Sequence, residues 1–134
     1  DAISHSLREA AHIVSAKATV IYTHSGSSSI RASRERPEAP ILSLTPKIST
    51  ARRLALVWGV HSVLTHETAD INTMTDLACK TALEEGFAKA GDNIVIAAGV
   101  PFGQAGTTNM LRLATVRPDT TTAPRKGRSG KKKV

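Results

Sequence analysis

The chain has 134 residues, 40% of them apolar, which is enough for one domain with a single core. No segment approaches the roughly 20 apolar residues of a membrane span, and the first residues do not resemble a signal peptide, so neither a membrane nor a secreted location is expected. The net charge is +7, but six basic residues and one acidic residue lie in residues 119–134 alone, so most of the basicity belongs to a tail.

Helical and strand patterns alternate along most of the chain. The spacing of apolar residues and the positions of Pro and Gly predict, in chain order, helix 2–15, strand Thr19–Tyr22, helix Ser27–Arg36, strand Ile41–Leu44, helix Ser49–Trp58, strand Ser62–Thr65, a helix from Asn72 or Thr73 to Glu85, and strand Asn93–Ala98. We expect a serine to cap the second helix, Ser49 or Thr50 to cap the third, and Gly86 to end the fourth.

This alternation predicts a parallel sheet with helices on both faces. A fifth strand, Met110–Val116, follows a connection too short for a crossover, so it should return antiparallel at or near an edge, where it could pair with another subunit. The expected fold is a three-layer α/β sandwich with a mixed five-stranded sheet, four strands parallel and the last antiparallel, within residues 1–117. Residues 118–134 are expected to form a basic disordered tail.

The first candidate site is the turn that joins the first strand to the second helix. It contains Thr23, His24, Ser25, Gly26, Ser27 and Ser28. Backbone N–H groups at a helix N-terminus attract an anion, and the hydroxyls add donors, so this turn could hold a phosphate. The alternative is a tight connection in which glycine serves only the turn geometry.

The second candidate is the loop Gly99–Asn109, which follows the fourth strand. It includes Gly103, Gln104, Ala105, Gly106 and Thr107. Ligands bind beyond the carboxyl ends of the strands in an open parallel sheet. If the first and fourth strands are neighbours, both loops face one pocket.

Residues suited to catalysis are scarce beside these loops. There is no phosphate-loop or dinucleotide-binding motif, and the five histidines lack the spacing of a zinc site. A hydrolase that uses His24 and Ser25 is disfavoured, because adjacent residues on a turn seldom face each other. Arg52 and Arg53 are expected to face solvent or a partner, and Trp58 to anchor the third helix on the sheet.

The single cysteine, Cys79, excludes an internal disulfide and favours a reducing compartment, so we expect a cytoplasmic protein. Its helical position predicts a core or half-buried thiol rather than a reactive one. Glu84 and Glu85 are expected to form a solvated helix end. A nucleic-acid binder led by the tail is disfavoured, because aromatic residues make up only 3% of the chain and few can stack on bases.

Several motifs together resemble the C-terminal domain of pyruvate kinase, in its bacterial form. They occur in one order over residues 1 to about 117, and they are Thr23-His24-Ser25-Gly26, Thr45-Pro46, Thr50-Ala51-Arg52-Arg53-Leu54, Trp58-Gly59-Val60, Gly91-Asp92, Ala98-Gly99-Val100-Pro101 and Gly106-Thr107-Thr108-Asn109. The resemblance implies a domain that carries an allosteric effector pocket and one interface of a tetramer. The two loops described above match that pocket.

The resemblance also implies an enzyme that transfers phosphoryl from phosphoenolpyruvate to ADP with Mg²⁺ or Mn²⁺ and K⁺. The catalytic residues of that family lie in a barrel that would precede residue 1, so the chain alone should be inactive. Relatives that bind a bisphosphate often use Arg and Trp from the segment corresponding to Thr65–Asp76, which has neither here, and the chain has Ser27 where many relatives have a basic or bulkier residue. A sugar monophosphate or AMP is therefore the expected effector. The alternative function is a free-standing phosphate-binding protein of the same fold.

Overall fold

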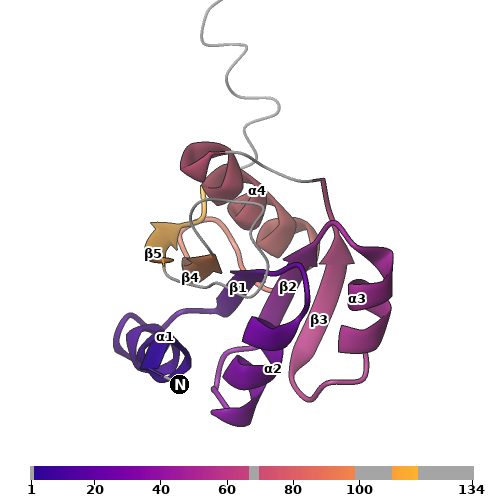
Figure 1. The fold of residues 1–134 in the computed structure, drawn as a ribbon. Helices are drawn as coiled ribbons and strands as arrows, with labels where there is room; N and C mark the ends of the chain where they lie inside the picture. The colour runs from indigo at the N-terminus through magenta and orange to yellow at the C-terminus, as the bar shows by residue number, and fades with distance from the viewer. Residues whose placement is uncertain (1, 67–69, 99–109, 118–134) are drawn as a thin grey trace, which may run out of the picture.

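A five-stranded sheet of order β3-β2-β1-β4-β5 forms the middle layer of the protein (Figure 1). The computed structural model describes residues 2–66, 70–98 and 110–117. The strands are β1 (Ala18–Tyr22), β2 (Ile41–Thr45), β3 (Val60–Leu64), β4 (Asn93–Ala98) and β5 (Met110–Thr115), and the helices are α1 (Ala2–Ile13), α2 (Ser27–Arg34), α3 (Ile48–Leu54) and α4 (Ile71–Glu84). The predicted three-layer α/β sandwich is confirmed.

The central strand, β1, is parallel to both of its neighbours. Thr19 pairs with Ile41 of β2 and with Val95 of β4. β3 is parallel to β2 at one edge, whereas β5 runs antiparallel to β4 at the other edge, with Asn93 opposite Thr115. Because β1 and β4 are adjacent and parallel, their carboxyl ends lie side by side, which is the condition that the two predicted loops require.

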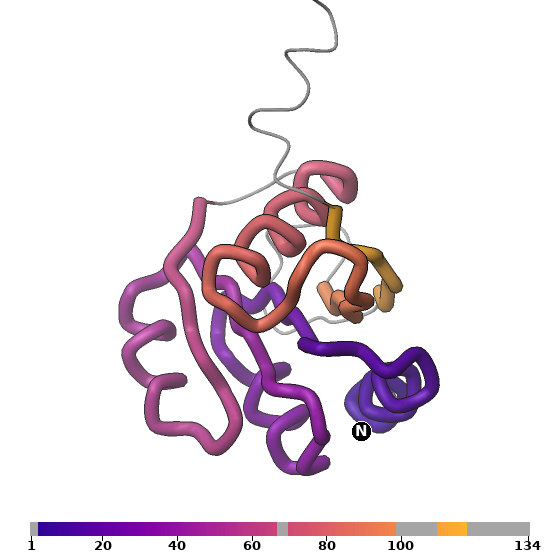
Figure 2. Tube along the Cα trace, turned by 180° about the vertical axis from the view of Figure 1, so that it is seen from behind, coloured from indigo at the N-terminus to yellow at the C-terminus, as the bar shows by residue number. Residues whose placement is uncertain are grey.

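Apolar side chains fill both faces of the sheet, which explains why β1 and β4 are mostly apolar. On one face, Met74 and Ala78 of α4 belong to the core. On the other face, Leu7 of α1 and Ala32 of α2 do so. α3 packs on β2 and β3, and two opposite views show α1 and α3 at opposite ends of the molecule (Figures 1 and 2).

The starts of α2 and α4 differ from the prediction. The N-cap of α2 is Gly26 rather than a serine, with φ of 91° and no side-chain cap. The N-cap of α4 is Asp70 rather than Asn72 or Thr73, because its carboxylate accepts the backbone N–H groups of both of those residues. The helix end at Gly86 is confirmed, with φ of 82°.

The third helix is shorter than predicted, and neither Ser49 nor Thr50 caps it. It begins after Lys47, which has no side-chain cap, and ends at Leu54. Residues 55–58, which were predicted to continue this helix, form turns instead. The Thr50 hydroxyl is buried and bonds to another part of the chain, so it cannot serve as the cap.

Two predictions fall outside the residues that the structure describes. They are the loop Gly99–Asn109, with Gly103, Gln104, Ala105, Gly106 and Thr107, and the tail 118–134. Among the helices of residues 2–66 and 70–98, none is long and apolar enough to cross a membrane.

Candidate functional site

The turn after β1 is closed by its own hydroxyl groups. The backbone N–H of Gly26 donates to Thr23 Oγ1 at 2.8 Å. The Ser25 hydroxyl accepts the backbone N–H of Ser27 at 3.3 Å and lies 3.1 Å from Ser27 Oγ. These bonds shape the residues that lead into α2, so the Ser25 hydroxyl has a structural role within the turn.

Gly26 is required by two independent features of this turn. Its φ of +91° lies in the left-handed region, which side chains with a Cβ rarely adopt. A Cβ at this position would also lie 3.2 Å from Leu54 Cδ2 and 3.4 Å from Thr50 Cγ2. Glycine therefore lets the start of α2 approach α3 closely.

The third helix binds the turn through two further side chains. The Thr50 hydroxyl donates to the backbone carbonyl of His24 at 2.6 Å, and the Arg53 guanidinium donates to the backbone carbonyl of Ser25. Arg53 was expected to face solvent or a partner; its side chain is exposed, but it also contacts the turn. Thr50 and Arg53 are three residues apart and so share a helix face, which is the signal that sequence reasoning overlooked.

The electrostatics of the turn favour an anion. The first turn of α2 contains no acidic residue, so the partial positive charge at its N-terminus is not neutralised by its own side chains. The Arg53 guanidinium adds a full positive charge beside Ser25. The turn therefore places the side chains of Ser27 and Ser28 and one cation at the N-terminus of α2.

Tyr22 links the end of β1 to the opposite face of the sheet. Its hydroxyl donates to the backbone carbonyl of Met74 in α4 at 3.3 Å. Burial raises the pKa of the Tyr22 hydroxyl well above its usual value, so the group stays a neutral donor. The residue before the turn is thus tied to α4, while the turn itself is tied to α3.

The strand that precedes the second predicted loop ends beside this turn. β4 ends at Ala98, and its neighbour Ala97 pairs with Ile21 of β1. Since Gly103, Gln104, Ala105, Gly106 and Thr107 lie outside the described residues, their part in a shared pocket stays a prediction.

In residues 2–66, 70–98 and 110–117, no group of three or more His, Cys, Asp or Glu side chains could hold a metal ion. Cys79 is partly buried, as predicted, and burial raises the pKa of its thiol. Glu84 lies 3.9 Å from Lys80 on the same helix, whereas Glu85 contacts His61 of β3 at 2.9 Å. Both glutamates thus contact side chains of the same domain.

The prediction for Trp58 was wrong. The residue is 51% exposed and does not anchor α3 on the sheet. The Arg36 guanidinium lies 4.2 Å from the centre of its ring, and the Ser33 hydroxyl donates to its backbone carbonyl at 2.6 Å. Trp58 therefore packs beside the end of α2, because α3 ends before reaching it.

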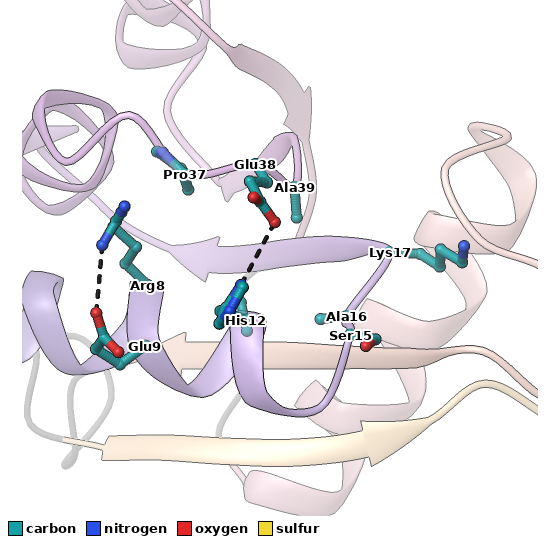
Figure 3. A pocket seen from close by; sticks show the side chains of 10 residues that line it. Arg8, Glu9, His12, Ser15, Ala16, Lys17, Pro37, Glu38 and Ala39 are labelled. Carbon is teal, nitrogen blue, oxygen red and sulfur yellow. Dashed lines mark hydrogen bonds and ion pairs between the residues drawn. The ribbon is translucent and has the colours of Figure 1, made fainter.

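A pocket of about 530 Å³ lies near the amino ends of β1 and β2, away from the turn (Figure 3). Arg8 contacts Glu9 at 3.2 Å, and His12 reaches across from α1 to Glu38 at 3.5 Å. Lys17 points away from the His12–Glu38 pair (Figure 3). Arg8 and Glu9 place paired charges of opposite sign in this pocket, whereas the first turn of α2 contains no acidic residue. Sequence reasoning did not predict it.

The fold and the turn together indicate the structural class of the protein, and comparison with known proteins then gives its family. The protein is a three-layer α/β domain in which a hydroxyl-rich turn follows the central strand and precedes a helix. The chain belongs to the family described as "Pyruvate kinase, alpha/beta domain", which matches residues 1–114. The resemblance inferred from the sequence motifs is thereby confirmed.

Individual relatives agree with this family. The chain is 45% identical over 116 residues to a pyruvate kinase of Methylorubrum extorquens, covering 87% of this chain and 24% of that protein. It is 38% identical over 116 residues to the pyruvate kinase of Clostridium acetobutylicum, with the same coverage. The pyruvate kinase of Staphylococcus haemolyticus is 42% identical over 113 residues, covering 84% of this chain and 19% of that protein. The chain thus spans a quarter or less of these relatives.

Proposed function

We propose that this chain is the regulatory and subunit-interface part of a pyruvate kinase, and that it binds a phosphate-bearing effector at the turn Thr23–Ser28. The observation that carries this proposal is the Arg53 guanidinium at the Ser25 carbonyl, beside the N-terminus of α2. A cation and a helix N-terminus at one place suit a phosphate group. Membership of the family supplies the context in which such binding would be regulatory.

The effector that fits best is a sugar monophosphate or AMP. The segment Thr65–Asp76 contains neither Arg nor Trp, the residues expected to hold a second phosphate. Gly103–Thr107 would complete the pocket from the second loop. On binding, the effector would shift the population of subunit arrangements, with coupling of about 1–3 kcal/mol.

The catalytic reaction, phosphoryl transfer from phosphoenolpyruvate to ADP, would belong to a barrel domain of the same enzyme. That part would hold Mg²⁺ or Mn²⁺ and K⁺, as membership of the family implies. The chain would act in the cytoplasm, as its single cysteine and the soluble nature of the proposed enzyme suggest.

The subunit interface would form along β5. This strand lies at an edge of the sheet, and its Leu111 and Leu113 are 36% and 53% exposed. An exposed, alternating edge strand can pair with the same strand of another copy. Tetramer assembly of the full enzyme would use this contact.

Calorimetry on this chain tests effector binding. Glucose 6-phosphate and AMP should bind, and fructose 1,6-bisphosphate should show no additional affinity from its second phosphate. The double variant Ser25→Asp with Ser28→Asp should abolish binding by like-charge repulsion, whereas Ser6→Asp, at an exposed position of α1, should not. Unchanged affinity in the double variant would contradict the site.

The alternative, a free-standing phosphate-binding protein, predicts the same effector binding in this titration. Such a protein would bind the effector without altering any catalytic activity. Fusion to the catalytic part of a relative separates the two functions, because only a regulatory domain should make phosphoenolpyruvate turnover respond to the effector.

A further inference from the structure

The pocket between α1 and residues 37–39 has a lining in which positive and negative charges balance (Figure 3). Its volume of about 530 Å³ is typical of pockets that hold small molecules. The small apolar residues of the lining are Ala11, Ala16, Pro37 and Ala39, and the charged ones are Arg8, Glu9, Lys17 and Glu38. Two positive and two negative side chains favour a ligand that carries both signs and no net charge.

The charged groups come from two walls of the pocket. On α1, Arg8 and His12 are four residues apart, which is about one helical turn. The His12 imidazole lies 3.5 Å from the carboxylate of Glu38 on the other wall (Figure 3), and Arg8 lies 3.2 Å from Glu9. Ion pairs between such exposed side chains contribute little to stability, so a ligand can replace them at small cost. Arg8 is then available to a carboxylate, and Glu38 to an ammonium group.

A buried hydroxyl lies directly behind this pocket. Thr19 is 2% exposed, and its Oγ1 has no hydrogen-bond partner among the described residues. Thr19 lines a gap too small for a water molecule, and Arg8 and Pro37 line both this gap and the pocket. A buried hydroxyl without a partner calls for an explanation, and a ligand group would supply the missing partner. Because Arg8 forms part of the wall, its movement toward a ligand would open the gap.

We propose that this pocket binds an amino acid in its zwitterionic form. Arg8 and the Thr19 hydroxyl would donate to the carboxylate, Glu38 would accept from the ammonium group, and an apolar side chain would rest on the alanines of the lining. The two charged groups of an amino acid are attached to one carbon, and Arg8 lies one helical turn from the histidine that Glu38 contacts. A sugar phosphate would instead bring net negative charge beside Glu9 and Glu38.

Calorimetry on this chain tests the proposal with three related ligands. They are L-leucine, 4-methylpentanoate, which lacks the ammonium group, and isopentylamine, which lacks the carboxylate. L-Leucine should bind, and each analogue should bind at least about tenfold more weakly, because hydrogen bonds to a charged group are lost. Equal affinity for L-leucine and either analogue would overturn the proposal. So would the absence of L-leucine binding at millimolar concentration.

A matched pair of variants tests the ammonium end. Glu38→Gln should weaken L-leucine binding about tenfold, because the ammonium group loses a charged acceptor. Glu35→Gln is the control and should bind L-leucine as the wild type does. Glu35 also contacts a histidine of α1, His5 at 3.8 Å, but it does not line the pocket. The same affinity in both variants would contradict the contact with Glu38.

Thr19 tests the carboxylate end. Thr19→Val should weaken L-leucine binding about tenfold without unfolding the protein, because the hydroxyl is unpaired in the free chain. Thr19→Ser retains the hydroxyl and should retain the affinity. Wild-type affinity in Thr19→Val would show that the hydroxyl does not contact the ligand.

AMP distinguishes this pocket from the turn Thr23–Ser28. Lys17 precedes β1 and Thr23 follows it, so the two sites lie at opposite ends of the same strand. Saturating AMP should therefore leave the affinity for L-leucine unchanged. Displacement of L-leucine by AMP would place it at the turn and overturn the proposal. Binding of L-leucine to a chain that binds no AMP would support the pocket and refute the effector site.

Discussion

Gly26 and Leu54 set how closely the start of α2 approaches α3. A Cβ at Gly26 would lie 3.2 Å from Leu54 Cδ2, in a backbone conformation with φ of +91°. This close approach brings together α2 and α3, the two helices that lie next to the proposed effector site. The geometry of the turn thus depends on the absence of one side chain.

Gly26→Ala should destabilise the protein more than an alanine at another left-handed glycine. The left-handed backbone alone costs about 1–2 kcal/mol for a residue with a Cβ, and the contact with Leu54 adds to this loss. Urea unfolding measures the difference. Gly59→Ala is the control, because Gly59 has φ of +73° but nothing within 4 Å of its Cβ position. Equal losses for the two variants would show that the approach to Leu54 is not tight.

Thr19→Val should stabilise the protein. Thr19 is 2% exposed, and its hydroxyl has no hydrogen-bond partner among the described residues. An apolar group of the same shape removes the cost of the unpaired hydroxyl, so we expect a gain of about 1 kcal/mol in the free energy of unfolding. Thr50→Val, at an equally buried hydroxyl that donates to His24, should have the opposite sign. A loss of stability in Thr19→Val would refute this account.

Because of Asp70, the stability of the protein should fall as the pH is lowered through the acid range. Hydrogen bonds from the Thr73 hydroxyl and backbone, and from the Asn72 backbone, lower the pKa of the Asp70 carboxyl in the folded protein. Its contribution is therefore complete above the unfolded-state pKa of about 3.9 and is lost as the pH falls through the lower folded-state value. In Asp70→Asn, thermal midpoints between pH 7 and pH 2 should decline less than in the wild type. Parallel declines would contradict the prediction.

Arg36 should shield Trp58 from solvent in the isolated chain. Its guanidinium lies 4.2 Å from the ring centre, and Trp58 is the only tryptophan. Arg36→Gln should therefore increase quenching of the intrinsic fluorescence by acrylamide. Arg34→Gln, at an exposed position of α2, should leave quenching at the wild-type value. Equal acrylamide quenching of Trp58 fluorescence in the two variants would show that Arg36 does not stack on Trp58 in solution.

The sequence predicted the regular elements well, because their signals are local. Apolar runs such as Ile94–Ala98 are typical of strands buried on both faces. Gly86, which has a left-handed backbone conformation, correctly predicted the end of α4. The caps were harder to predict. Asp70 competes with Asn72 and Thr73 for the same role, and all three residue types are good caps, so only the backbone geometry selects Asp70.

The contacts around the candidate site were predicted only in part, for a related reason. The turn Thr23–Ser28 has a local pattern of hydroxyls and glycine, and the structure places it at the expected end of β1. The contacts of Thr50 and Arg53 with this turn span 26 and 28 residues. Contacts at such separations depend on how α2 and α3 pack, which no local pattern records.

By itself, the sequence determined which segments are strands and helices, that the last strand returns antiparallel, and that the chain resembles a domain of pyruvate kinase. Local periodicity is enough for the elements and a short connection for the direction of the last strand, whereas the resemblance rests on motifs that occur in one order along the chain. Only the tertiary structure decided that α3 contacts the turn, that Trp58 is exposed beside Arg36, and that a pocket lies near the amino ends of β1 and β2. These features arise where distant segments meet, so their energies depend on the packing of the whole domain.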